Sequence, residues 1–397
     1  MRYSQVFGSV PVVVVQPTNE DADPQAVRIL NVTAQGFDLL QVEAPGGAGC
    51  ATCTGKGLGM TVNWLAALPG SYRFPNIVPE AAFRLGVQPS APGLGVLVKV
   101  GTVSTSANQR SISAGGFASW PATSWQPVIY PAHVGINPLN FVFSSPPIVL
   151  TTIQTWNAAN EGTDLNLAGL APTLTGVPEP WATVVSRNVT ATGFNVALES
   201  SEVDNDDTGT AGFDAAETIG YIAIQSGVSV QLRQNDGPVV GLGTGTGTAT
   251  DTCTAINVLF PTGTPLVAAN FRGFAGKQTR ANGDGGWLRR CVFSSPAANT
   301  ARMTVKVDED DDLDIDREHA TPETFGAAVF GGDFTTTPIA LAYLSSARSG
   351  ASINVRFSTA TEVGHLGYRI WGRTDAQSDW QALHSDLIVS ANADGMV

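Results

Sequence analysis

Two related stretches, Asn31-Val-Thr-Ala-Gln-Gly-Phe37 and Asn188-Val-Thr-Ala-Thr-Gly-Phe194, decide the fold of this chain. Each predicts a strand, a tight turn with its glycine in the left-handed conformation, and a second strand whose phenylalanine enters a core. An aromatic residue, Trp64 or Tyr221, follows each phenylalanine after 27 residues. Equal spacing indicates a duplicated unit in which this aromatic faces the phenylalanine across a sandwich. The predicted structural motif comprises Gly36, Phe37, Trp64, Gly193, Phe194 and Tyr221.

The repeat extends beyond these stretches. A strand-like segment that begins with proline lies upstream of each copy, at Pro11–Val15 and Pro146–Leu150. A third, weaker copy follows; it lacks the Gly-Phe pair but shares a Glu-Thr-x-Gly element with the second copy, at Glu217–Gly220 and Glu323–Gly326. Strand-like segments separated by turn residues recur along the whole chain, and helical periodicity is almost absent. We therefore predict an all-β protein of tandem antiparallel β-sandwich modules.

Composition and charge limit the kinds of partner that this chain is expected to bind. The chain has 397 residues and a net charge of −13, with no cluster of Lys and Arg. Phosphate binding needs a basic surface, so we expect no nucleic-acid partner. No apolar run reaches the ~20 residues of a membrane-spanning helix, so we expect no membrane insertion.

The four cysteines favour an oxidising compartment. Cys253 and Cys291 flank one predicted module, and we expect them to form a disulfide. Cys50 and Cys53 form a C-x-x-C among glycines with no helix pattern after it, unlike a redox motif. We predict a local disulfide there, with free thiols, or metal or redox chemistry, as the alternatives.

Two acidic runs are candidate binding sites. Asp308-Glu-Asp-Asp-Asp-Leu-Asp-Ile-Asp316 has the oxygen density that suits Ca²⁺, although its spacing is not that of an EF-hand. The alternatives are a calcium site or a solvated acidic loop. Glu202–Asp207 occupies the corresponding place in the second copy, and His319 lies beside the first run. The candidate calcium ligands are Asp308, Asp310, Asp312, Asp314 and Asp316, and the candidate residues for another ligand are Asp206, Asp207 and His319.

Catalytic motifs are missing from the sequence, which contains no Gly-x-Ser-x-Gly, no His-Glu-x-x-His and no phosphate-binding loop. We therefore expect a protein that is not an enzyme. The alternating glycines from Gly241 to Ala249 do not precede a helix, and we predict a linker or a flexible strand edge there.

The repeated motif, with its closing Trp64-Leu-Ala66 or Tyr221-Ile-Ala223, resembles the H-type lectin domain. Val98-Lys-Val-Gly101, Trp125–Tyr130 and Phe143 follow that family's strand order. The resemblance covers residues 85–230 well, 1–75 in part and 233–335 weakly. It implies a six-stranded sandwich that commonly trimerises and binds terminal sugars such as N-acetylgalactosamine. The arginine and histidine that contact sugar in that family have no assigned counterparts here.

The predicted organisation has four parts. The first copy has only ten residues before Pro11, so it either lacks its opening strands or takes a strand from another chain. The tail, with Ser352–Gly372, resembles the start of an immunoglobulin-like module of large bacterial surface proteins. The predicted segments are a partial lectin-like sandwich at 1–84, a complete one at 85–232, a divergent one at 233–335 and a partial immunoglobulin-like segment at 336–397.

Two functions fit these features. The first is a secreted or cell-surface protein that binds carbohydrate or mediates adhesion, with glycans as partners. The second is a structural subunit of an extracellular filament, sheath or virion appendage, whose partners are copies of itself and which exchanges strands between subunits.

Overall fold

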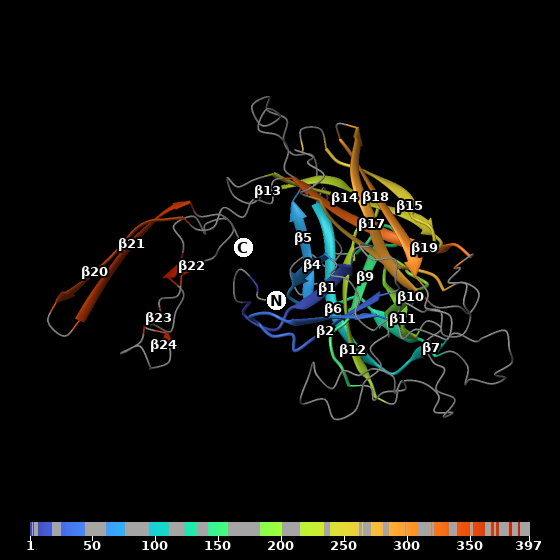
Figure 1. The fold of residues 1–397 in the computed structure, drawn as a ribbon, viewed down its shortest axis with the longest axis horizontal. Coiled ribbons are helices and arrows are strands. Elements are labelled where there is room, and N and C mark those ends of the chain that lie inside the picture. Colours follow the sequence, from blue (N-terminus) through green and yellow to red (C-terminus); the bar gives the residue numbers. More distant parts are fainter. Residues whose placement is uncertain are drawn as a thin grey trace.

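In the computed structural model of this chain, the described residues form strands and turns, which confirms the all-β prediction (Figure 1). The sheets are antiparallel apart from one short parallel pairing. The structure describes residues 1, 3, 7–17, 25–43, 61–75, 95–110, 124–132, 142–157, 183–200, 215–233, 239–261, 264, 271–280, 286–297, 299–308, 319, 321–332, 340–349, 352–361, 367–368, 371–372, 381–382 and 388–389.

The second repeat, β6 to β12, is a sandwich of two sheets. One sheet has the strand order β5-β6-β12-β9, and in the other β11 pairs with β10, β8 and β7. Phe194 and Tyr221 lie in the core between the two sheets. The strands are β6 (Gly95–Thr105), β7 (Asn108–Arg110), β8 (Gln126–Ile129), β9 (Ile148–Ile153), β10 (Thr183–Arg187), β11 (Gly193–Ser200) and β12 (Glu217–Ile224).

The third repeat, β14 to β19, has the same arrangement. Its sheets have the strand orders β13-β14-β19-β16 and β15-β18-β17. Its core uses Phe260, Phe271 and Phe325 rather than the Gly-Phe pair. The strands are β13 (Ser229–Arg233), β14 (Val239–Ala249), β15 (Thr254–Leu259), β16 (Arg272–Lys277), β17 (Trp287–Ala297), β18 (Thr300–Asp308) and β19 (Glu323–Gly332).

The first repeat, β1 to β4, is smaller. It consists of the pair β1-β4 and the pair β2-β3, which enclose Val13, Ile29 and Phe37. By order and register, β1, β9 and β16 are equivalent strands, and so are β4, β12 and β19, which we call the closing strands. In the described residues the first repeat has no counterpart of the opening strands β6 and β14. The strands are β1 (Val12–Pro17), β2 (Gln25–Leu30), β3 (Asp38–Glu43) and β4 (Val62–Ala67).

The three repeats share a central core. The outer faces of their β1-, β6- and β14-containing sheets meet there, so β1, β9 and most of β16 are buried on both faces. The sequences of β1 and β9 are accordingly apolar with little alternation. These three strands contact one another, and β1 and β9 lie close together near the middle of the repeats (Figure 1). The core contains Val12, Val14, Val96, Val98, Val100, Ile148, Leu150, Ile222, Ile224, Leu242, Phe274 and Ala328.

A hairpin follows each closing strand. After β4, strand β5 (Gly70–Pro75) pairs with β6, and after β12, strand β13 pairs with β14. Both pairs cross the predicted boundaries near 84 and 232, which stay predictions. After β19 comes the hairpin of β20 (Ala340–Ser349) and β21 (Ser352–Thr361), which pairs with no other described strand. The remaining tail strands, in the pairs β22-β25 and β23-β24, are β22 (Gly367–Tyr368), β23 (Trp371–Gly372), β24 (Gln381–Ala382) and β25 (Ile388–Val389).

The motif turn differs from the prediction in which residue is left-handed. Asn31 and Asn188 have φ values of 52° and 50°, whereas the motif glycines are not among the residues with positive φ. Asparagine tolerates this conformation better than other non-glycine residues. Gly193 is instead required by close approach, because a Cβ there would overlap the carbonyl oxygen of Val128 on β8.

A threonine closes the same turn in both copies. The backbone N–H of Gly36 donates to Thr33 Oγ1 and that of Gly193 donates to Thr190 Oγ1, at 3.2 and 3.1 Å. Each threonine hydroxyl in turn donates to the carbonyl of its glycine. The motif threonine thus holds the turn through its hydroxyl.

The glycine-rich stretch from Gly241 to Ala249 is not a linker. It forms most of β14, which pairs with β13 on one side and β19 on the other. A Cβ at Gly241 would lie 2.6 Å from the ring of Phe260, and one at Gly247 would lie 2.9 Å from the ring of Phe325. The alternating glycines therefore form one face of an internal strand, on which bulky core side chains rest directly.

Candidate functional site: the seams and the open edge

An aromatic cluster marks the first two repeats. In the second, Tyr130 stacks at a tilt on Phe194, and Phe194 meets Tyr221 edge to face at 5.2 Å. In the first, Phe37 meets Trp64 edge to face at 5.9 Å, as predicted for the motif. Tyr3 occupies the place of Tyr130, because their N–H groups bond the equivalent carbonyls of Gln35 and Thr192. The sequence interpretation missed Tyr3, since the chain between Tyr3 and its motif is much shorter than the corresponding one in the second repeat.

Burial governs the tyrosines of these clusters. The hydroxyls of Tyr3 and Tyr130 are buried and make no hydrogen bond to the described residues. Burial raises the pKa of Tyr3 and of Tyr221 to about 12 and raises that of Tyr130 further, since water no longer solvates the phenolate. These rings are therefore neutral core residues rather than proton-transfer groups at neutral pH.

Side-chain amides join the repeats along three seams. At the seam of repeats one and two, Gln154 accepts from Val13 N–H at 3.0 Å and donates to Val13 C=O. A Cβ at Gly220 would lie 2.7 Å from this amide, so the glycine makes room for it. At the seam of repeats two and three, Gln278 donates to Pro147 C=O at 3.4 Å and lies against Gly326 in the same way.

The seam of repeats three and one uses different amides. Asn63 stands where the other closing strands have Gly220 and Gly326, and its amide donates to Gly273 C=O at 3.4 Å. Gln16 accepts from Ala275 N–H at 2.8 Å and donates to Leu288 C=O at 3.0 Å. Each repeat thus bonds β1, β9 or β16, or the residue just before it, in the repeat that precedes it around the ring, and the three contacts close a ring with pseudo-threefold symmetry.

A small cavity lies on the axis of this ring. Its volume is about 70 Å³, which is room for a few water molecules. Equivalent residues of all three repeats line it, which confirms the register drawn above. They include Val15, Thr151 and Ala275, and next to them Gln16, Thr152 and Gly276.

Buried ions reinforce two of the seams. At the first, Arg28 of β2 pairs with Glu217 of β12 at 3.4 Å and donates to Thr155 C=O, with both side chains at most 2% exposed. Thr155 Oγ1 and Asn157 N–H also donate to Glu217. The carboxylate is therefore fully enclosed by donors, which makes the pair sensitive to the loss of either partner.

At the second seam, Glu199 of β11 accepts from Lys277 Nζ at 2.8 Å and pairs with Arg280 at 3.0 Å. Glu323, the equivalent of Glu217, lies 3.5 Å from Lys277 and 3.6 Å from the buried imidazole of His319. Two cations and two carboxylates thus balance one another at this seam. His319, a predicted ligand residue, belongs to this internal cluster.

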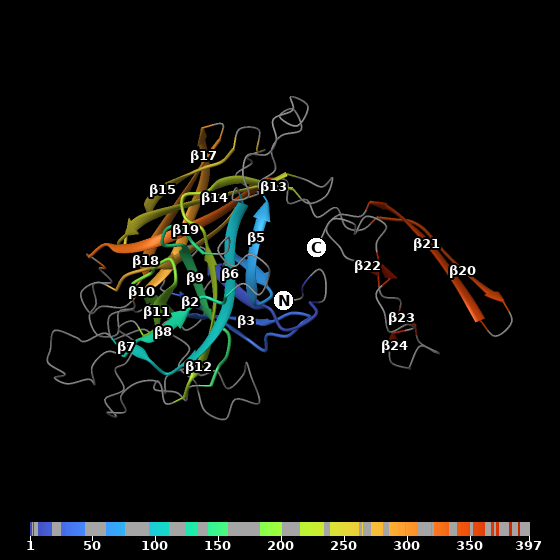
Figure 2. The same ribbon diagram turned by 180° about the vertical axis from the view of Figure 1, so that it is seen from behind.

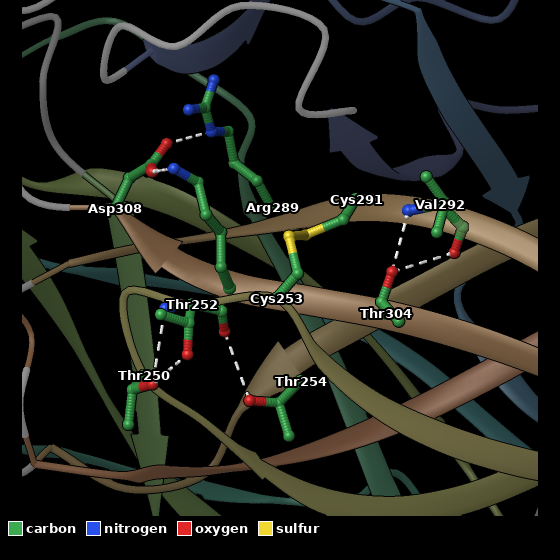
Figure 3. Close-up of a disulfide and its surroundings, with 10 residues drawn as sticks. Thr250, Thr252, Cys253, Thr254, Arg289, Cys291, Val292, Thr304 and Asp308 are labelled. Carbon is green, nitrogen blue, oxygen red and sulfur yellow. Dashed lines mark hydrogen bonds and ion pairs between the residues drawn. A yellow bond between two sulfur atoms is a disulfide. The ribbon is translucent and has the colours of Figure 1, made fainter.

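Among the described residues, the third seam has no matching carboxylate. Arg289 on β17 is equivalent to Arg28 and is fully buried, but it pairs with Asp308 of its own repeat, which also holds Lys306 (Figure 3). Its two terminal nitrogens make no hydrogen bond to the described residues. The sequence places Met60, outside the described residues, where the other repeats have Glu217 and Glu323. The first predicted calcium ligand, Asp308, is therefore engaged by two cations.

The disulfide prediction is confirmed for Cys253 and Cys291, whose Cα atoms lie 6.2 Å apart (Figure 3). The bond joins β17 to the residue before β15, across the middle strand β18. Closing a loop of this length stabilises the fold by about 4 kcal/mol in the chain-entropy account.

The outer edge of β4 is open. Val13 and Val15 direct their N–H groups to Gln154 and to Thr152 Oγ1, away from β4. In an antiparallel pair, two directly opposed residues point their backbone groups either toward each other or away from each other. Ala66 and Trp64 are opposite Val13 and Val15, so they direct their N–H and C=O groups away from β1, to the other edge of β4. No described strand pairs there, whereas β12 carries β6 and β19 carries β14. Trp64 is 37% exposed, against 3% for Tyr221.

An open hollow of about 320 Å³ lies over the motif turn of the second repeat. Ile129, which is 84% exposed, forms its apolar part. Polar groups of Asn188, Thr192 and Asn195 line the rest. An apolar platform flanked by hydroxyls and amides is the composition of many sites for small polar ligands.

The other predicted site residues lie outside the described part of the chain, and their assignments stay predictions. Among the described residues, no group of three His, Cys, Asp or Glu side chains could hold a metal ion. The residues outside are Cys50, Cys53, Asp206, Asp207, Asp310, Asp312, Asp314 and Asp316.

Comparison with known proteins adds no assignment, since no family model, no curated protein and no solved structure matches the chain significantly. In the described residues, no helix is long and apolar enough to cross a bilayer.

Proposed function

We propose that this chain is a non-catalytic structural subunit of an extracellular assembly and that it associates with copies of itself through the open edge of β4. The observation that supports this is that no described strand covers the outer edge of β4: Trp64 and Ala66 direct backbone groups there, where both other closing strands are covered. Such an edge is a template for a strand from another chain. The Cys253–Cys291 disulfide supports an oxidising location.

The test compares Ala66→Pro with the matched control Ala66→Val. Proline removes an N–H from the open edge while the bonds between β1 and β4 remain. Light scattering over a concentration series is expected to show assemblies for the wild type and Ala66→Val, and single chains of 41.2 kDa for Ala66→Pro. A wild type that stays a single chain at every concentration would contradict the proposal.

The hollow beside Ile129 favours a second candidate function, the binding of a carbohydrate. An exposed aliphatic side chain can pack on a sugar ring while Asn188 and Asn195 bond its hydroxyls. A glycan array is expected to give hits that the free sugar competes away and that Ile129→Asp abolishes. Leu259→Asp, at an exposed apolar position on the third repeat, is the control. Hits unchanged by Ile129→Asp would exclude this hollow.

A further inference from the structure

We propose that the strand completing β4 is β21 of a second copy, delivered by the β20–β21 hairpin; this rests on the proposed function and names its partner. Three hairpins occupy the same place in the chain, each directly after a closing strand: β5–β6, β13–β14 and β20–β21. In the first two, the second strand of the hairpin lies antiparallel to the closing strand of the next repeat. The third hairpin has no such partner among the described strands.

The order of the repeats around the ring indicates which closing strand the third hairpin would cover. Repeat three contacts repeat one through Asn63 and Gln16, so repeat one is the next repeat around the ring. Its closing strand, β4, is also the one with an open edge. One chain therefore carries both a hairpin that pairs with no other described strand and a closing strand whose outer edge no described strand covers.

The sequence of β21 suits that place. β6 alternates Val96, Val98 and Val100, which enter the central core, with Lys99 between them. β21 has Ile353, Val355 and Phe357 in the same alternation with Arg356 between them, over 10 residues against 11 in β6. Leu65 and Ala67 of β4 already pack on the central core, next to the position these side chains would take.

The occupant is a second copy rather than the same chain. In both views the hairpin lies apart from the strands of the three repeats (Figures 1 and 2). A free donor and a free acceptor on each chain produce a head-to-tail polymer, because each added copy presents a new open edge.

The test mixes two variants that each lack one half of the joint. Val355→Pro removes the donor strand, Ala66→Pro removes the acceptor, and Val355→Thr is the matched control that keeps the N–H and the branched side chain. Circular dichroism and an intact Cys253–Cys291 bond establish that the variants fold. Each variant alone is expected to give single chains, the mixture to give particles of twice that mass and no larger, and the control to assemble as the wild type does.

Each of the other outcomes would overturn a specific part of the two proposals. Assembly by Val355→Pro, together with its loss in Ala66→Pro, would reject the hairpin as donor while the proposed function stands. A mixture that stays at the mass of single chains would reject the joint between copies. A monomeric wild type whose melting temperature falls with both variants would indicate closure within one chain. A monomeric wild type that neither variant changes would reject both proposals.

Discussion

Strands β4 and β12 belong to the same repeated sequence pattern but lie in different surroundings in the fold. β12 and β4 follow the motif phenylalanine at the same distance, and each places an aromatic ring against it. β12 lies between two neighbours and is buried almost throughout, whereas β4 has one neighbour among the described strands and an exposed tryptophan. The motif therefore determines the turn and the ring packing, while the completeness of the sheet depends on which strand the adjoining hairpin delivers.

The largest expected effect tests the two aromatic clusters against each other. Phe194→Ala should lower the free energy of unfolding by about 4 kcal/mol and Phe37→Ala by about 3 kcal/mol, because a truncated ring leaves a cavity that is deeper in the complete sandwich. Denaturant titration of both variants measures the difference. A larger loss from Phe37→Ala would mean that the first repeat is not the less complete one.

The seams give the next contrast. Arg28→Met should cost about 3 kcal/mol, since it leaves Glu217 buried without its cation. Arg289→Met, at the equivalent position, should cost less than about 1 kcal/mol, because Asp308 keeps Lys306 after it loses the Arg289 Nε pair and because the two terminal nitrogens make no hydrogen bond to the described residues. Thermal unfolding of the pair measures this, and equal losses would contradict the difference between the seams.

A smaller effect is expected at the motif turn. Gly193→Ala should cost about 2 kcal/mol, since the added methyl forces β8 and β11 apart at Val128. Gly8→Ala, where a Cβ meets no atom within 4 Å, is the control and should change nothing measurable. If Gly193→Ala were also silent, the strand contact at this turn would be looser than described.

The smallest effect is the response of the tyrosines to alkali. Their folded pKa values lie above the ordinary value of 10.0, so the unfolded chain loses these protons first and stability falls as pH rises above 10. For Tyr3 the fall spans pH 10 to about 12. Tyr130→Phe should be neutral or stabilise by up to about 1 kcal/mol at neutral pH, because its hydroxyl has no partner, and should flatten the alkaline fall. Unfolding at neutral and alkaline pH measures both, and a destabilised Tyr130→Phe would show that the hydroxyl is bonded.

Local sequence patterns predicted the fold better than they predicted the contacts between repeats. The equal spacing of the motif identified the pairs of aromatic rings, because strand alternation and core burial act within a short stretch. The same reasoning misassigned β14, since glycines that expose backbone to bulky core side chains look like a linker when the partner strands are unknown.

The seams could not be predicted. Gln154 and Gln278 are equivalent, but the remaining seam uses Asn63 at another position, so no signal common to all three repeats marks these amides. The ion pairs join residues far apart in the chain, such as Arg28 and Glu217, and only the ring arrangement brings them together.

Placing all three repeats on one polypeptide has a consequence for dilution. In a ring of separate chains, the contacts would dissociate as the protein concentration fell. Here the segments that link the repeats keep the effective concentration of each repeat for its neighbours constant. Separate identical chains would also have to change all three contacts at once. In this molecule a mutation alters one contact and leaves the other two intact, so each can diverge independently.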